Sequence, residues 1–190
     1  MTKTVLYLHG FASSSRSEKS LLTQAYFRQY LPDIRLLSPD LPYTPAEAMT
    51  VINTALADTV PAAVIGSSLG GFLSTCLAER YGCRACLINP AVAPHRVLSR
   101  FLGEYEHPVL RQRYQVKQEH MTELEQLMPQ QLAQPQNYLV LLQTGDEVLD
   151  YRQALSFYQG ANIELVQGGD HSFKGYADYL PAIAKFCQLA

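Results

Sequence analysis

The sequence predicts an α/β protein with three layers, in which an open, mostly parallel sheet of about six strands carries helices on both faces. Two observations lead to this prediction. Short runs rich in Val, Ile and Leu alternate along the chain with longer segments whose apolar residues recur at helical spacing. Most of these runs are apolar at nearly every position, which is typical of parallel strands buried on both faces.

Six apolar runs are the expected strands, and five segments between or after them are the expected helices. The strand runs read TVLYL (4–8), IRLLS (34–38), AAVIGS (62–67), ACLIN (85–89), YLVLLQ (138–143) and NIELVQ (162–167). The helices are expected near 16–31, 45–59, 69–82, 151–159 and 175–188. Helical crossovers between parallel strands are right-handed, so the alternation predicts a doubly wound sheet.

Residues 91–137 interrupt this alternation, because they separate two expected strands by far more chain than one crossover helix needs. The segment contains four prolines, and its middle part, 115–128, has helical character and many Gln and Glu residues. We expect a single domain over 1–190, with 91–137 inserted as a small cap or lid of one or two helices.

Composition and charge exclude several classes of partner. The chain has 190 residues and a formal net charge of −2, and it shows no basic stripe of the kind that binds nucleic acid. No run approaches the ~18 apolar residues of a membrane span. The four apolar residues before His9 are too few for a signal-peptide core. We therefore expect a cytoplasmic protein that does not bind nucleic acid.

The four cysteines include one C-x-x-C pair, Cys83 and Cys86. The pair leads into an apolar run rather than opening a helix, where redox-active pairs lie. No second pair and no nearby pair of histidines completes a zinc site. We interpret the cysteines as structural and expect no metal and no organic cofactor.

Residues with chemical function follow four of the expected strands. His9 follows the first strand, Ser68 the third, Asp146 the fifth and His171 the sixth. In open parallel sheets, sites form beyond the carboxyl ends of the strands. We therefore expect these four residues to converge at one edge of the sheet.

Ser68 is the expected nucleophile. It lies between Gly66 and Gly70 in a G-x-S-x-G pattern after a strand and before a helix, as in a nucleophile elbow. Its neighbour Ser67 has larger residues at the two equivalent positions. The pentapeptide alone would also fit a plain turn, so the prediction depends on partners elsewhere in the chain.

A serine hydroxyl needs a base, and His171 is the candidate because it follows the last strand and a flexible glycine pair. The histidines of the inserted segment, His95, His107 and His120, have no comparable setting and are expected at the surface. These assignments predict one general base, His171, for the serine.

The base needs a carboxylate to orient it, and Asp146 is preferred because it comes first after its strand. Asp150 remains an alternative, although its position favours a helix N-cap. Glu147 is expected to face solvent. Asp170 is the residue directly before His171, and a carboxylate in that position is poorly placed to accept a hydrogen bond from the His171 imidazole.

Two backbone N–H groups are expected to hold the developing oxyanion. The residue after the nucleophile, Leu69, supplies one of them, and Phe11 in the loop after the first strand supplies the other. Gly10 permits a close approach of the backbone there, and His9 is expected to order that loop.

These motifs, in this order, resemble those of the α/β-hydrolase superfamily and, more narrowly, of the small bacterial YqiA/YcfP-like esterases. The similarity spans nearly the whole chain. It is carried by LYLHGFxSS (6–14), IGSSLGG (65–71), NPA (89–91), QTGDEVLDYRQA (143–154) and GGDHSF (168–173). The family's GGNH variant reads GGDH here, which places the charge of Asp170 beside the expected base.

The resemblance implies a minimal α/β-hydrolase fold without the first two strands of larger members. It also implies the triad Ser68, Asp146 and His171, and activity on acyl esters, thioesters included. We therefore expect a serine esterase that acts on a small-molecule acyl ester through an acyl-enzyme. The alternatives are an acyl-CoA thioesterase, peptidase or lyase chemistry on the same scaffold, and a non-catalytic binding protein.

Overall fold

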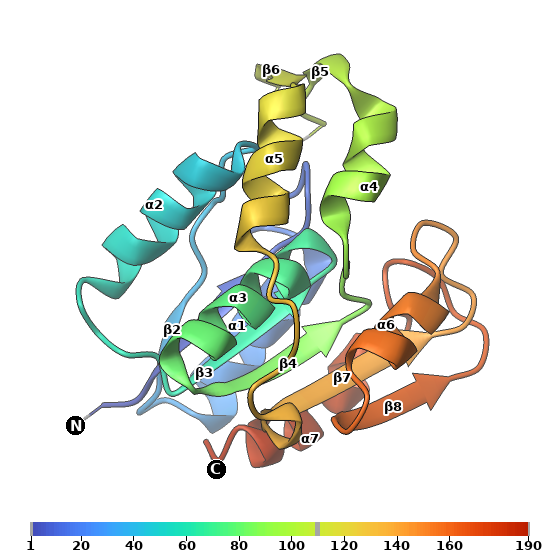
Figure 1. Ribbon diagram of the computed structural model, residues 1–190. Coiled ribbons are helices and arrows are strands. Elements are labelled where there is room, and N and C mark those ends of the chain that lie inside the picture. The colour runs from blue at the N-terminus through green and yellow to red at the C-terminus, as the bar shows by residue number, and fades with distance from the viewer. Residues whose placement is uncertain (1, 109–110, 190) are drawn as a thin grey trace.

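The computed structural model describes residues 2–108 and 111–189, and its centre is a sheet of six parallel strands (Figure 1). The strand order is β2-β1-β3-β4-β7-β8. The strands are β1 (Thr4–Leu8), β2 (Arg35–Leu37), β3 (Ala63–Ser67), β4 (Arg84–Ile88), β7 (Tyr138–Gln143) and β8 (Asn162–Val166). Each of the six matches an apolar run, so the predicted parallel sheet is confirmed.

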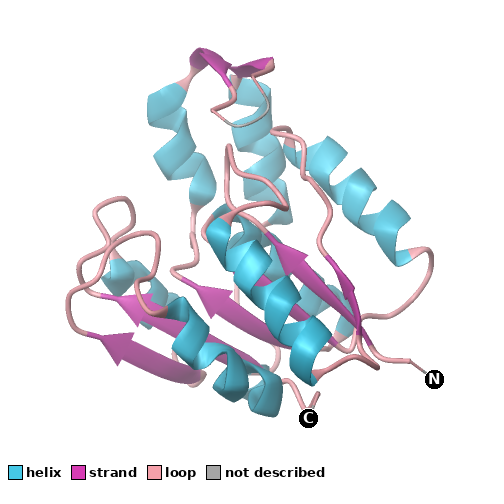
Figure 2. Ribbon diagram, turned by 180° about the vertical axis from the view of Figure 1, so that it is seen from behind, coloured by secondary structure: helices cyan, strands magenta, loops and turns pink. Residues whose placement is uncertain are grey.

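Helices cover both faces of this sheet, which confirms the three-layer prediction (Figures 1 and 2). One face packs against α1 (Glu18–Tyr30) and α7 (Tyr176–Phe186). The other face packs against α2 (Pro45–Leu56), α3 (Leu69–Tyr81) and α6 (Tyr151–Phe157). Successive strand residues enter opposite cores, because side chains alternate across a strand. In β1, for example, Tyr7 faces α1 and α7, whereas Leu6 faces α2 and α3.

Local sequence sets the helix ends. Proline is the first residue of α2, a position where a backbone N–H would have no partner within the helix, so its absence costs nothing. Helix α3 ends at Gly82, whose φ of 65° is a left-handed conformation that glycine adopts readily.

The sheet reverses its winding direction at β1, which lies between β2 and β3. The connection after β1 runs through α1 on one face, and the connection after β2 runs through α2 on the other. A crevice opens at the carboxyl ends of the strands at such a switch point. Strands β1 and β3 border this crevice, and they are directly followed by His9 and Ser68.

The segment 91–137 forms two helices and a small hairpin above the carboxyl edge of the sheet (Figure 1). Its elements are α4 (Pro94–Leu98), η1 (Ser99–Phe101), β5 (Gly103–Glu106), β6 (Arg113–Val116), α5 (Gln118–Leu127) and η2 (Pro135–Asn137). Helix α5 lies within the part of the segment for which the sequence predicts a helix. The sequence does not predict the antiparallel β5–β6 pair, because the four-residue strands GEYE and RYQV contain no apolar run. Strand β5 is mostly exposed, and in β6 only Tyr114 and Val116 are buried.

The expectation that the histidines of this segment lie at the surface is wrong. His107 is only 8% exposed, His120 is 6% exposed, and His95 is partly buried. His107 Nε2 lies 3.1 Å from the carbonyl oxygen of Ser13, in the loop after β1. His120 packs against the ring of Tyr43. His107 and His120 are buried because the inserted segment packs onto the loops that follow β1 and β2.

The four cysteines are free thiols. Cys86 lies within β4, and its complete burial raises the pKa of its thiol. Within residues 2–108 and 111–189, no group of three or more His, Cys, Asp or Glu side chains has the arrangement of a metal site. In the same ranges, no helix combines the length and apolar character needed to cross a membrane.

Candidate active site

Ser68 lies at the junction of β3 and α3 with φ 55° and ψ −119°, a strained conformation for a residue with a side chain. Its N–H donates to the carbonyl oxygen of Ile88 at 3.0 Å. Its carbonyl oxygen accepts from the N–H groups of Gly71 at 3.0 Å and Ala91 at 3.1 Å. Neighbouring backbone thus holds the strained turn in place, as in a nucleophile elbow.

The glycines around Ser68 allow backbone segments to approach closely. A Cβ on Gly70 would lie 2.1 Å from the carbonyl oxygen of Leu8, and a Cβ on Gly66 would lie 2.2 Å from that of Gly70. Gly10 lies close to Ser68, since a Cβ added there would come within 3.3 Å of the Cβ of the serine. The elbow therefore needs glycine because β1, β3 and α3 meet in one small space.

Substituting Gly70 with alanine is expected to destabilise the fold by about 3 kcal/mol or more, because backbone atoms must move to admit the new Cβ. Gly82 is the matched control: its φ is +65° and nothing lies within 4 Å of a Cβ added there. Gly82→Ala should cost about 1 kcal/mol from backbone strain alone. Urea denaturation measures both values, and equal losses would contradict the close approach at Gly70.

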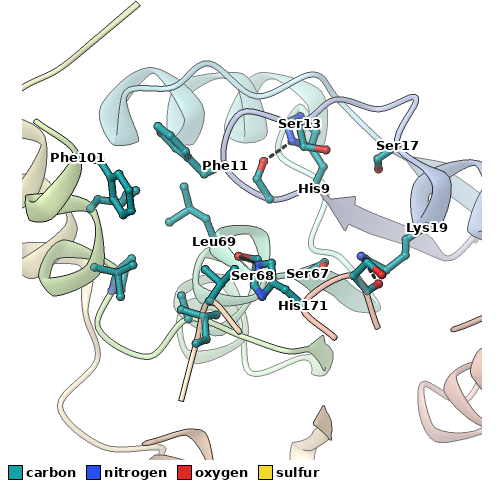
Figure 3. Close-up of a pocket in the computed structure, with 18 of the residues that line it drawn as sticks. His9, Phe11, Ser13, Ser17, Lys19, Ser67, Ser68, Leu69, Phe101 and His171 are labelled. Atoms are coloured by element: carbon teal, nitrogen blue, oxygen red, sulfur yellow. Dashed lines mark hydrogen bonds between the residues drawn. The ribbon is translucent and has the colours of Figure 1, made fainter. Parts of the chain in front are cut away.

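Three side chains from three strand ends form a hydrogen-bonded chain at the carboxyl edge. His171 Nε2 lies 3.0 Å from Ser68 Oγ (Figure 3). His171 Nδ1 lies 2.9 and 2.8 Å from the two oxygens of Asp146, whose side chain is only 2% exposed. The carboxylate accepts a hydrogen bond from Nδ1–H, so Nε2 is the nitrogen that faces the serine hydroxyl and can accept its proton. The structure thus brings together the three residues that the sequence singled out.

The two carboxylates considered for the acid occupy different places. Asp146 Oδ1 accepts the backbone N–H groups of Val148 at 2.9 Å and Leu149 at 2.8 Å in addition to the histidine. Asp150 is the N-cap of α6, where its side chain accepts the N–H of Arg152 at 3.0 Å. The carboxylate that contacts the imidazole is therefore Asp146.

Two buried polar residues that the sequence reasoning did not single out hold the loop that carries His171. Asn89 follows β4, and its Nδ2 donates to the carbonyl oxygens of Asp170 at 3.0 Å and His171 at 3.3 Å. Gln143 ends β7, and its Oε1 accepts the N–H groups of Asp170 and Lys174, both at 3.0 Å. In the sequence, each of these two residues is a polar residue at the end of an apolar run. That feature is the only sequence signal that could have pointed to them.

The other two acids near the base also support its loop. Glu147 is exposed, as expected, yet its carboxylate accepts the backbone N–H of His171 at 3.0 Å. Asp170 accepts the hydroxyl of Ser172 at 2.5 Å and pairs with Lys174 at 3.1 Å. These bonds, led by that from Ser172, lower the pKa of Asp170. The negative charge of Asp170 is thus stabilised by Ser172 and Lys174 of the same loop.

His9 orders the loop after β1. The N–H of Leu41 donates to His9 Nε2 at 2.9 Å, so the other nitrogen, Nδ1, carries a proton and donates to the carbonyl oxygen of Gly10 at 2.8 Å. Burial lowers the pKa of His9, which keeps the ring neutral. The loop that contains Phe11 is therefore fixed next to Ser68.

A cavity of about 580 Å³ opens over Ser68. Figure 3 shows Phe11, Leu69 and Phe101 on one side of the serine and Ser17 and Lys19 on the other. The apolar side also includes residues of α4, so the inserted segment forms part of the wall. Among the described residues, the backbone N–H groups of Phe11 and Leu69 have no hydrogen-bond acceptor. Both remain available to a ligand.

This sheet, with Ser68 in a tight turn after β3, has the fold of the α/β hydrolases. A family model matches residues 4–188, nearly the whole chain. The chain belongs to the Uncharacterised protein family (UPF0227).

Several solved structures have the same fold. The α/β hydrolase domain-containing protein 10 from mouse is 15% identical, with a TM-score of 0.71 over 99% of this chain and 90% of that one. Est1E from Butyrivibrio proteoclasticus, solved with ferulic acid, is 16% identical, with a TM-score of 0.67 over 98% and 88%. The esterase domain of a Rhodothermus marinus protein is 18% identical, with a TM-score of 0.67 over 98% and 87%. Identities this low establish a common fold.

Proposed function

We propose that this protein is a serine esterase that hydrolyses carboxylic esters. The observation that carries the proposal is the hydrogen-bonded chain from Ser68 through His171 to Asp146, which opens into a largely apolar cavity. A nucleophile, a base and an orienting acid in this arrangement are the machinery of acyl transfer. The esterases among the structures of similar fold support the same class of reaction.

In the first half of the reaction, His171 Nε2 takes the proton of Ser68 as its Oγ attacks the ester carbonyl carbon. The oxygen of the tetrahedral intermediate becomes negative, and the N–H groups of Leu69 and Phe11 stabilise it. The bond to the leaving oxygen then breaks, and His171 transfers its proton to that oxygen. An alcohol leaves and an acyl-serine remains.

In the second half, His171 removes a proton from water, which attacks the acyl carbon. The second intermediate collapses, Ser68 Oγ recovers the proton, and the carboxylic acid departs. Asp146 stabilises the imidazolium in both halves. We propose that the reaction uses no metal and no organic cofactor, because side-chain and backbone groups supply every step.

The apolar side of the cavity is proposed to receive the acyl group. Residues 91–137 would act as a cap, because α4 and η1 supply part of that wall. An acyl-CoA thioester could react by the same steps, so the preference between an oxygen ester and an acyl-CoA must be measured as a ratio of kcat/KM. We also propose that the enzyme acts in the cytoplasm, which its four free cysteines support.

A fluorophosphonate probe tests this proposal, because it reacts only with an activated serine. The wild-type protein should hydrolyse p-nitrophenyl butyrate and should carry one probe adduct, which peptide mass spectrometry should locate on Ser68. An adduct on Ser67 would overturn the choice of nucleophile. A folded protein that neither hydrolyses a panel of esters and thioesters nor reacts with the probe would overturn the proposed function.

A further inference from the structure

One end of the cavity is polar, in contrast to the rest of its wall. Tyr7, Ser17, Lys19 and Ser67 line this end (Figure 3 labels the last three). They come from β1, the start of α1 and the end of β3. Lys19 is the only lysine or arginine among the described residues that line the cavity.

The ammonium group of Lys19 is incompletely satisfied. Its Nζ donates to the carbonyl oxygen of Ser172 at 2.7 Å, which engages one of three protons. Glu18, Asp170 and Asp146 contribute negative charge nearby, but within residues 2–108 and 111–189 no carboxylate lies within ion-pair distance of Nζ. Burial lowers the pKa of Lys19, as expected for a cation that lacks a close counter-charge.

Tyr7 provides a second, independent sign of a ligand at this end. The residue is 1% exposed, and its hydroxyl has no hydrogen-bond partner among the described residues. Burial raises the pKa of Tyr7, so the hydroxyl stays a neutral donor. The hydroxyl of Ser17 is near enough to offset part of this rise in the pKa of Tyr7, but the two hydroxyls do not reach hydrogen-bond geometry. Ser17 is the N-cap residue of α1, yet its hydroxyl accepts no N–H there, so it too can donate to a ligand. A buried hydroxyl without a partner is costly, and a bound acceptor would remove that cost.

The position of His171 tells which part of the substrate reaches this end. His171 Nε2 delivers the proton to the leaving oxygen, so the alcohol part must lie on its side of Ser68. Lys19 is bonded to Ser172, the residue next to His171, and Figure 3 shows Lys19 on the side opposite Phe11 and Phe101. The polar end therefore faces the alcohol part, and the apolar end faces the acyl part.

We infer that this polar end is a subsite for a carboxylate on the alcohol part of the ester, so that the preferred substrates are acyl esters of hydroxy acids. The inference rests on the proposed function. One ammonium and neutral hydroxyl donors suit a single negative charge that accepts several hydrogen bonds. The carboxylate of Glu147, which also lines the cavity, accepts the N–H of His171. It forms no ion pair with Lys19 in the part of the chain that the structure describes.

Two esters that differ only in this charge test the inference. Meta-carboxyphenyl butyrate and meta-carbamoylphenyl butyrate share the acyl group and have leaving groups of similar size. The wild-type enzyme should prefer the carboxylate ester in kcat/KM by about tenfold, as expected for one charge-assisted hydrogen bond. Lys19→Met should remove this preference, and Tyr7→Phe should reduce it. Lys185→Met, which removes a charge from the exposed end of α7, should leave the preference unchanged.

The outcomes separate the two proposals. If the wild-type protein hydrolyses neither ester and the fluorophosphonate probe does not react with it, the proposed esterase function fails. If it hydrolyses both esters without preferring the carboxylate, the subsite inference alone fails, whether or not the variants fold. If Lys19→Met lowers kcat/KM for both esters equally, Lys19 only supports the His171 loop through Ser172, and the inference is again overturned.

Discussion

Replacing Ser68 with alanine is expected to lower kcat for ester hydrolysis by about 10⁶-fold, the loss typical of removing the nucleophile of a serine hydrolase triad. The change removes only Oγ, so His171 has no hydroxyl to deprotonate and no acyl-enzyme can form. The elbow itself should persist, because alanine meets the same strain as serine at φ 55°. Ester hydrolysis and fluorophosphonate labelling should therefore disappear while the thermal unfolding temperature changes little.

Ser156→Ala is the matched control for this variant. Ser156 is exposed on α6, away from the cavity wall, and its loss should leave kcat unchanged. Labelling that survives in the Ser68 variant would show that another side chain is the nucleophile. Loss of folding in that variant would instead show that the hydroxyl stabilises the turn, and wild-type adduct mapping would then decide the assignment.

The sheet and its main helices could be predicted because hydrophobic patterning dominates their energetics. The run TVLYL, for example, is buried on all five residues, and its unbroken apolar and β-branched composition is typical of a central parallel strand. The β5–β6 hairpin could not be predicted in this way. Its strands pair with each other above the sheet and are mostly exposed, so no apolar run marks them. Its formation depends on tertiary contacts such as those of the Tyr114 ring with the rings of Phe11 and Tyr43.

The arrangement of the candidate site could be predicted from the sequence where close backbone contacts require a particular residue type. Gly66 and Gly70 are required by close backbone contacts, and they marked Ser68. The side chains that hold the His171 loop are not required by any local backbone contact, so no comparable sequence pattern marks them. Asn89 and Gln143 act through carbonyl and N–H groups of a loop that lies 27 or more positions along the chain, and only the folded structure brings them together.

Asp146→Asn is expected to lower kcat by about 10⁴-fold through the tautomer of His171. The backbone N–H groups of Val148 and Leu149 both donate to Oδ1, so the amide oxygen of asparagine should keep that position. Its NH₂ group then faces His171 Nδ1 and donates to it. The imidazole must carry its proton on Nε2, where it donates to Ser68 Oγ and cannot accept the serine proton.

Asp150→Asn is the matched control, because asparagine caps a helix as well as aspartate does. Among the described residues, the Asp150 side chain bonds only to Arg152 at the start of α6, so its substitution should leave kcat unchanged. Steady-state hydrolysis of p-nitrophenyl butyrate by the two variants compares the carboxylates directly. A large loss in the Asp150 variant with little loss in the Asp146 variant would reverse the assignment. A loss in the Asp146 variant with wild-type thermal stability would identify the tautomer, rather than the fold, as the property that the carboxylate controls.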